Sequence, residues 1–245
     1  LPSGHEHFRV VKTADASNSL QSLVQAVLVT SNALKSLDIS KCKLAPKVVK
    51  ELAALVPQMT HIAQLTIDST ADIKKQSTYT LDTNGSALDL SSKNLGEEDI
   101  ALVSAWIQLP QSKGLRVLNV LKNPIGEAGL STLVDAVRGL PIGSICGLTE
   151  GQTSVDWSGQ GLGPMDCKII AADFGLACSC LQHISVFNLS NNQLRPAAVA
   201  VLANVVGQMR NLEELQLCQN QLGSPAFTSG MPAESEQQPA LAVTK

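Results

Sequence analysis

The sequence predicts a repetitive α/β fold, in which each unit consists of a short strand, a bend and a helix. The unit is clearest in N-L-E-E-L-Q-L-C-Q-N-Q-L-G, residues 211–223, which follows the spacing L-x-x-L-x-L-x-x-N-x-L. Leu215 and Leu217 lie two positions apart, so a strand points both side chains to one face. One such unit cannot bury its own apolar face, and it therefore needs copies of itself.

Six further segments match this spacing, which makes seven copies in one frame. The central strand residue is Leu37, Leu65, Leu88, Leu118, Val155, Phe187 and Leu215, and subtraction gives steps of 28, 23, 30, 37, 32 and 28 residues. The bend position holds Cys42, Thr70, Lys93, Asn123, Gln160, Asn192 and Asn220. Seven matches in frame do not arise by chance, so the repeat organises the chain.

A helix is predicted after most bends, and five helices start at the same distance from the last apolar residue of the motif. Proline at the first helical position is pre-organised and loses no needed hydrogen bond. Where glycine replaces it, an acidic residue follows in the first turn, where the helix dipole favours it. The predicted helices are 46–56, 97–109, 127–137, 164 to about 180 with a break at Gly175, and 196–206. The last helix is expected to turn Val199, Leu202, Ala203 and Val206 inward.

Two stretches depart from the repeat. Residues 71–86 are polar and β-branched and contain the turn signal Asn84-Gly85, and the step of 23 residues is too short for the usual helix. This segment is predicted to be an irregular or extended crossing. Residues 139–151 contain four glycines and supply the extra length of the 37-residue step, so they are predicted to form a loop that projects from one edge.

The chain is therefore divided into three parts. Residues 1–31 are expected to form a partial repeat or a capping helix, because a helical stripe covers 17–29 and Phe8 lies one repeat before Leu37. Residues 32–223 form the array, irregular at 71–86 and 139–151. Residues 224–245 lack a helical stripe and are predicted to be a flexible tail, or one that is ordered only by a partner.

Composition limits the function. Hydrophobic residues make up 44% of the chain and aromatic residues 3%, so the core is aliphatic. Charged residues are 16%, below the roughly 25% of typical soluble domains, which suits a protein that lies against another molecule and equally suits an ordinary soluble protein. The net charge of −3 gives no footprint for nucleic acid. The sequence contains no apolar run of about 18 residues, so no transmembrane segment is predicted. The first residues show no initiator Met and no signal-peptide core, so a processed or truncated chain stays open.

The six cysteines are scattered, without the paired spacing of a disulfide framework. They are therefore interpreted as reduced, mostly buried thiols of an intracellular, reducing compartment, either the cytoplasm or the interior of an organelle. Cys178 and Cys180 form the one close pair. A redox or metal role for this pair stays open, but no second pair or nearby histidine completes a site. The sequence predicts no metal and no cofactor.

A strand, an Asn-type bend and a full helix in units near 28 residues resemble the ribonuclease-inhibitor-like subclass of leucine-rich repeats, over about residues 16–223. The resemblance implies a curved right-handed solenoid with parallel strands on the concave face and helices on the convex face. Proteins of this subclass are mostly intracellular and mostly bind other proteins. Residues 147–164 are also similar to irregular repeat proteins of algae and other protists, which implies no defined activity. Lys93 and Gln160 at Asn positions, and one missing helix, predict uneven curvature.

In this geometry the residues between the strand leucines face the concave side. We call the central set the strand row: Asp38, Thr66, Asp89, Asn119, Asp156, Asn188 and Gln216. A flanking row holds Ser40, Asp68, Ser91, Leu121, Ser158, Ser190 and Cys218, with Leu121 expected to be exposed. The strand row, together with Asp68 and Leu121, is the predicted partner-binding surface, suited to a polar or mildly basic partner. The alternative is that these residues are merely solvated. Asn123, Asn192 and Asn220 are predicted to be structural, because an Asn at the bend can bond open backbone groups.

No catalytic motif occurs in the sequence, so no catalytic residue is proposed. The predicted function is a non-catalytic protein–protein interaction module, as a scaffold or a structural subunit of a larger assembly with one or more protein partners. Binding is expected through the concave face, the 139–151 loop and an apolar C-terminal edge. The alternative is a regulator of an enzyme, such as a GTPase-activating protein, which the resembled subclass includes. An acidic tail would favour that alternative, but the tail holds only Glu234 and Glu236. An enzyme in its own right comes third.

Overall fold

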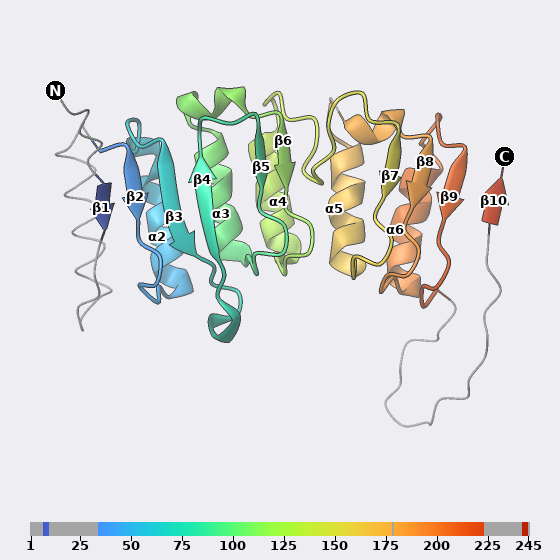
Figure 1. Cartoon of the computed structure of the whole chain (residues 1–245), viewed down its shortest axis with the longest axis horizontal. Helices are drawn as coiled ribbons and strands as arrows, with labels where there is room; N and C mark the ends of the chain where they lie inside the picture. Colours follow the sequence, from blue (N-terminus) through green and yellow to red (C-terminus); the bar gives the residue numbers. More distant parts are fainter. Residues whose placement is uncertain (1–6, 10–33, 178, 223–241, 245) are drawn as a thin grey trace. The chain divides into compact units, whose positions relative to one another are not determined.

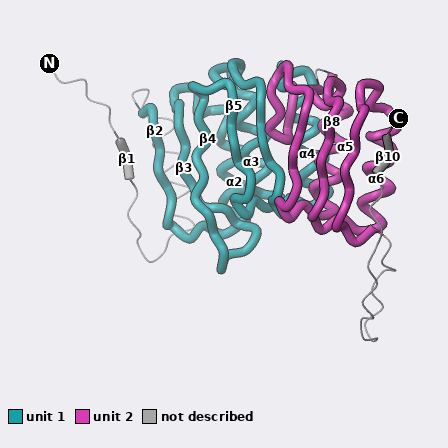
Figure 2. Tube along the Cα trace, turned by 45° about the vertical axis from the view of Figure 1, so that its right-hand side comes forward, with its two compact units in different colours: residues 1–142 teal, residues 143–245 magenta. Residues whose placement is uncertain are grey.

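The chain is mixed α/β, with short parallel strands and helices (Figure 1). The structure is a computed structural model that describes residues 34–177 and 179–222, together with the backbone of 7–9 and 242–244. The predicted helix over 17–29 and most of the predicted tail, at 224–241 and 245, lie outside the described residues. Two compact units divide the chain, Leu1–Ile142 and Gly143–Lys245 (Figure 2).

The described residues of unit 1 form two sheets. The first has the order β1-β2-β3-β4, in which β1 (His7–Arg9), β2 (Ser36–Asp38) and β3 (Gln64–Asp68) run parallel. The strand β4 (Thr78–Asp82) runs antiparallel to β3. The second sheet pairs β5 (Ala87–Asp89) with β6 (Val117–Asn119) in parallel. The predicted central residues lie opposite one another, since Leu37 pairs with Leu65 and Leu88 with Leu118.

The α-helices among the described residues of unit 1 are α2 (Pro46–Leu55), α3 (Glu97–Ile107) and α4 (Gly126–Val137). The helix α3 packs against both α2 and α4. Three short 3₁₀ helices follow bends or helix ends: η1 (Val56–Gln58), η2 (Ile73–Lys75) and η3 (Pro110–Gly114). Pro46 occupies the first position of α2, and Glu97 to Asp99 place acidic side chains in the first turn of α3.

Unit 2 contains one sheet of the order β10-β9-β8-β7. The strands β7 (Ser154–Asp156), β8 (Val186–Asn188) and β9 (Glu214–Gln216) are parallel, and β10 (Ala242–Thr244) pairs antiparallel with β9. The helices α5 (Pro164–Phe174) and α6 (Pro196–Val206) pack against each other. A 3₁₀ helix, η4 (Cys180–His183), precedes β8.

The core lies where the motif places its apolar residues. Leu37, Leu65, Leu118 and Phe187 are all at most 2% exposed. In unit 2 the ring of Trp157 meets the ring of Phe187 edge to face, with centroids 5.4 Å apart, a favourable arrangement for aromatic rings. All five predicted helix starts are confirmed to within one residue. The regular spacing of the motif therefore fixes both the strand centres and the helix starts.

Two helix predictions need correction. The helix α5 ends at Phe174, and the chain continues through turns to η4 rather than as a helix to about Cys180. In α6 the buried residues are Ala198, Leu202 and Val205, whereas Ala203 is exposed. The helix is rotated so that Ala198, Leu202 and Val205 face the interior. Val199, Ala203 and Val206 instead lie along an open side.

The two stretches outside the repeat have defined structures. Residues 71–86 contain η2 and the antiparallel strand β4, so the expected extended crossing is in part a hairpin with β3. Residues 139–151 contain no helix and no regular strand. The segment nonetheless has a buried side, because Ile142, Ile145 and Leu148 are at most 3% exposed.

Candidate functional site

Asn123 joins neighbouring strand segments of unit 1 through its side chain. Its Oδ1 accepts hydrogen bonds from the backbone N–H groups of Lys93 (2.9 Å) and Leu95 (3.0 Å). Its Nδ2 donates to the carbonyls of Leu90 (2.8 Å) and Val120 (3.0 Å). These are the bonds that a structural role at the bend predicts. With 4% of its surface exposed, Asn123 offers little to a partner.

Asn192 and Asn220 repeat this arrangement in unit 2. Oδ1 of Asn192 accepts from the N–H of Leu162 at 2.9 Å, and its Nδ2 donates to the carbonyl of Trp157 at 2.8 Å. Oδ1 of Asn220 accepts from the N–H groups of Asn192 (3.2 Å) and Leu194 (3.3 Å). Both asparagines are buried, so each provides hydrogen bonds to backbone groups that water cannot reach.

At one bend that lacks this asparagine, a buried aspartate supplies the acceptor. Thr70 holds the bend position, and Asp99 Oδ2 accepts from the Thr70 N–H (2.8 Å), the Thr70 hydroxyl (3.0 Å) and the Gly96 N–H (2.8 Å). Asp99 is 0% exposed, and this burial raises its pKa although the hydrogen bonds act to lower it. The sequence shows Asp99 only as an acid in a helix first turn, so its long-range partners were not predicted.

Asp173 has the same role beside the 139–151 loop. Its Oδ2 accepts from the Ser144 hydroxyl (2.6 Å) and from the N–H groups of Ile145 (2.7 Å) and Cys146 (3.0 Å). Its Oδ1 accepts from the Ser179 hydroxyl at 3.2 Å. Burial raises the pKa of Asp173 as well. One carboxylate therefore accepts hydrogen bonds from three residues of the loop, and no sequence signal marked that carboxylate.

The strand row lies in register within each sheet. In unit 1 Asp38 pairs with Thr66, and Asp89 pairs with Asn119. In unit 2 Asp156 pairs with Asn188, which in turn pairs with Gln216. Asp89 and Asp156 are exposed, and the other five residues of the row are half-buried. Each aspartate stands beside a neutral polar partner, so no like charges lie directly opposite each other.

Five residues of the row share a turn that the sequence analysis missed. In each, the side-chain oxygen accepts a hydrogen bond from the backbone N–H two residues later, at 2.9–3.2 Å. The residues are Asp38, Asp89, Asn119, Asp156 and Asn188. This is an Asx turn, which ends the strand and fixes the side chain. The sequence does contain a pattern for this turn, since four of the five residues are followed two positions later by serine.

Two predicted partner-binding residues are not available at the surface. Leu121 was expected to be exposed, but it is 3% exposed, because the chain turns after β6 and packs this side chain inward. Asp68 is 7% exposed, and its Oδ1 accepts from the Thr78 hydroxyl at 2.6 Å while Oδ2 accepts from the Lys41 N–H. The expected exposure of both residues is therefore wrong.

The hairpin strand β4 adds a residue to the row. Thr80 lies opposite Thr66, and their hydroxyl oxygens are 3.0 Å apart. Thr80 is half-buried. It was not predicted, because the segment that contains it lacks the repeat spacing. The polar side chains on this sheet thus run Asp38, Thr66, Thr80 across three neighbouring strands.

The electrostatics of the row are mild. Hydrogen bonds from the hydroxyl and then the N–H of Ser158 lower the pKa of Asp156, so this exposed carboxylate is more firmly ionised than a free one. Among the residues that the structure describes, no group of three or more His, Cys, Asp or Glu side chains is placed to hold a metal ion. The row carries hydrogen-bonding groups and the negative charge of its aspartates.

An apolar groove of about 320 Å³ lies at the end of unit 2, between α6 and the strands β8 and β9. The residues that line it are Leu189, Leu194, Val199, Leu202, Ala203, Val206, Gly207, Leu215, Leu217 and Leu222. The apolar stripe predicted for α6 thus forms one wall of this groove. The predicted C-terminal binding edge falls here, and its role stays a prediction.

Cys146, Cys167 and Cys180 are buried, and Cys42 and Cys218 are half-buried. Cys178 lies outside the described residues, so the pair with Cys180 stays untested. In the part of the chain that the structure describes, every helix is too short or too polar to cross a membrane.

Comparison with known proteins adds no family assignment: no protein-family model matches the chain, and no curated protein matches it. The resemblance to leucine-rich repeats therefore rests on the residues of the motif alone.

Proposed function

We propose that this chain is a non-catalytic protein–protein interaction module, built as a leucine-rich-repeat solenoid, and that it serves as a scaffold or structural subunit of a larger assembly. The observation that carries the proposal is the strand row, in which polar side chains stand in register and five of the seven are held by Asx turns. A surface that is fixed before binding loses little conformational entropy when a partner docks. The repeated strand, asparagine ladder and helix support the solenoid.

The partner that fits this row is a protein with a basic or polar surface. Asp89 and Asp156 carry negative charge at exposed positions, and Asn119 and Asn188 add amide groups beside them. Charged groups of this kind steer association and set specificity more than they add affinity. Binding should therefore weaken as salt is raised.

The first test is the native mass of the protein after gentle isolation from its source. A stoichiometric complex well above 25.8 kDa supports a structural subunit, and its other components identify the assembly. A lone chain of 25.8 kDa under the same gentle conditions would argue against a permanent subunit.

The second test removes charge from the row without breaking its turns. Asp89→Asn with Asp156→Asn keeps an oxygen that accepts the bonds from Ser91 and Ser158, so only the charge changes. We expect the partner's affinity to fall about ten-fold or more, with unchanged thermal stability. The matched control is Glu127→Gln with Asp135→Asn, which removes two exposed charges from α4 and none from the strands. Equal loss in both pairs, or no loss in either, would place the interface elsewhere.

A further inference from the structure

The loop between β3 and β4 carries an exposed apolar tip. This loop extends past the ends of β3 and β4 in Figures 1 and 2, and its outermost part is η2. Ile73 in η2 is 61% exposed, and it is the one exposed large apolar side chain of the residues that the structure describes. A single exposed apolar side chain is common on protein surfaces, so Ile73 matters here only together with the charged side chains at the same end of unit 1.

The tip is held in this shape by its own hydrogen bonds. The Asp72 carboxylate accepts from the N–H of Lys74 at 2.9 Å, which caps η2. Ser69 closes the base of the loop, because its N–H donates to the Ser77 carbonyl at 2.9 Å and its hydroxyl accepts from the Ser77 N–H at 3.0 Å. Asn94 Nδ2 donates to the Asp72 carbonyl at 3.2 Å. The exposure of Ile73 is thus a property of a well-bonded loop.

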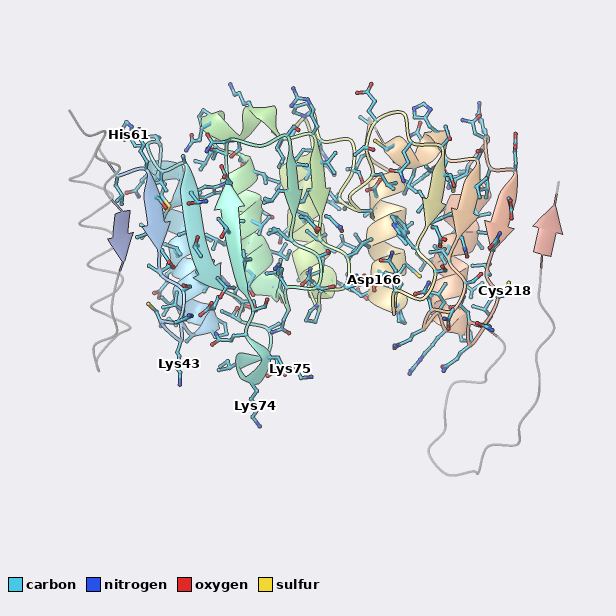
Figure 3. The ribbon with its side chains drawn as sticks, viewed as in Figure 1. Lys43, His61, Lys74, Lys75, Asp166 and Cys218 are labelled. Atoms are coloured by element: carbon cyan, nitrogen blue, oxygen red, sulfur yellow. The ribbon has the colours of Figure 1, made fainter. Side chains whose placement is uncertain are left out.

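Three lysines lie at the same end of unit 1 as the apolar tip. Figure 3 shows Lys43, Lys74 and Lys75 at the same end of unit 1, with Lys74 directed away from the protein. All three are exposed. The structure shows no ion pair for them within its described residues. Lys75 shares the lining of a depression with Glu97 and Glu98, so part of its charge is offset, whereas Lys74 is not among the lining residues.

We propose that this tip, formed by Ile73 with Lys43, Lys74 and Lys75, binds the anionic surface of a lipid membrane. In this arrangement Ile73 enters the headgroup region and the lysines remain at the level of the lipid phosphates. Lysine suits this task because its long apolar stem follows an apolar side chain inward while the ammonium group stays in water. The inference is independent of the proposed protein-binding row.

The composition of the tip favours a membrane over an acidic protein. Carboxylates on a protein are matched best by arginine, whose planar group makes two parallel hydrogen bonds, and lysine is depleted at protein interfaces. The tip holds lysines and no arginine. A diffuse layer of lipid phosphates needs only point charges, which lysine supplies. A protruding shape also meets a flat surface more readily than it encloses a peptide.

Binding of this kind is weak and depends on salt. One lysine near an anionic surface changes the partition coefficient about five-fold, so Lys43 and Lys74 together account for a factor on the order of 25. Lys75 adds less, because Glu97 and Glu98 lie beside it. The net charge of −3 opposes the attraction at long range, which confines it to the tip. We therefore expect reversible, peripheral attachment.

The test is sedimentation of the whole chain with vesicles of phosphatidylcholine, with or without phosphatidylserine. The wild-type chain should bind only the vesicles that contain phosphatidylserine, and higher salt should release it. Lys43→Glu with Lys74→Glu should abolish this binding. The matched control is Lys35→Glu with Lys113→Glu, which makes the same charge change before β2 and β6 rather than after a strand end. The control should bind like the wild type.

Insertion of the apolar side chain is tested separately. Ile73→Ser should lower binding several-fold while all the lysines remain. Ile73→Trp should bind at least as well as the wild type. Its fluorescence should shift to shorter wavelengths when phosphatidylserine vesicles are added. Trp106 and Trp157 are buried, so the shift reports on the new tryptophan.

Three results would overturn the proposal: no binding of the wild type to either vesicle, equal loss of binding in the Lys35 and Lys113 control, or no fluorescence shift of Ile73→Trp. Binding to an acidic protein that depends on Lys74, without any binding to vesicles, would replace the membrane with a protein partner. None of these outcomes depends on the strand row, so failure here leaves the proposed function standing.

Discussion

The hydroxyl of Tyr79 donates a hydrogen bond of 3.1 Å to Oδ1 of Asp99, and both residues are almost fully buried. This bond joins the hairpin strand β4 to the first turn of α3. Asp99 also accepts three bonds on its other oxygen, so it serves the bend, the helix start and the hairpin at once. The irregular segment 71–86 is thereby made part of the unit 1 core.

Replacing Tyr79 by Phe should lower the free energy of unfolding by about 1–3 kcal/mol, because a buried hydrogen bond to a carboxylate is lost while the ring remains. Chemical denaturation measures this loss. In a background of Asp99→Asn, where the acceptor carries no charge, the same replacement should cost less. Equal costs in both backgrounds would show that the two residues are not coupled.

The buried aspartates give the protein an unusual pH dependence. Burial raises the pKa of Asp99 and of Asp173 above the value of about 3.8 in the unfolded chain. At a pH between the unfolded-state pKa and the folded-state pKa of such a residue, the folded state binds more protons than the unfolded state. The contribution of each group to stability therefore increases as pH falls through this window and is lost as pH rises through it.

Denaturation at a series of pH values tests this sign. The difference in unfolding free energy between the wild type and Asp99→Asn should shift in favour of the wild type as pH is lowered toward 3.8. Asp156→Asn should give the opposite trend, because hydrogen bonds lower the pKa of that exposed carboxylate and its contribution disappears on acidification. A parallel pH dependence for the wild type and Asp99→Asn would contradict the assignment.

Much of the fold follows from the spacing of apolar residues. Leu37, Leu65 and Leu118 were placed at strand centres because a strand repeats every two residues and the motif repeats in frame. Pro46 and Pro196 located the starts of α2 and α6, because proline is favourable at the first position of a helix and unfavourable in its interior. These are local rules, so they can be applied to the sequence without any knowledge of distant contacts.

The remaining features depend on contacts between distant residues. Asp99 and Asp173 look like ordinary helix residues in the sequence, and their roles depend on segments up to 29 residues away. Leu121 seemed exposed because the strand alternation was extended one step too far, past the Asx turn at Asn119. In contrast, the Asp-x-Ser and Asn-x-Ser pattern behind the strand row is local and could have been read.

The asparagine ladder should dominate the stability of unit 2. Replacing Asn192 by Ala removes the partner of the Leu162 N–H and of the Trp157 and Leu189 carbonyls, all of them buried. Each unsatisfied buried group costs about 1–3 kcal/mol, so we expect a loss of at least 3 kcal/mol in the free energy of unfolding. Asn204→Ala, on the exposed side of α6, is the control and should change it by less than about 0.5 kcal/mol. Similar melting temperatures for both variants would contradict the claim that the asparagine ladder dominates the stability of unit 2.

The strand row should distinguish loss of charge from loss of the turn. Asp89→Asn keeps the acceptor for the Ser91 N–H, whereas Asp89→Ala removes it. We expect Asn to leave the unfolding free energy nearly unchanged and Ala to lower it by about 0.5–1.5 kcal/mol. Thermal denaturation of the two variants side by side measures the difference. If Ala were as stable as Asn, the turn would not explain why these residues occur at the strand ends.

The thiols should differ in their reactivity according to burial. Burial raises the pKa of Cys167 to about 12, and burial together with the nearby Asp173 carboxylate raises the pKa of Cys146 well above its ordinary value. Because the thiolate is the reactive form, both residues should resist alkylation in the folded protein. Cys218 is half-buried and should react first among the thiols of unit 2 that the structure describes. Mass spectrometry after a brief exposure to iodoacetamide identifies the labelled sites, and denaturant should make Cys146 and Cys167 reactive. Rapid labelling of Cys167 in the native protein would mean that α5 opens more readily than its buried face suggests.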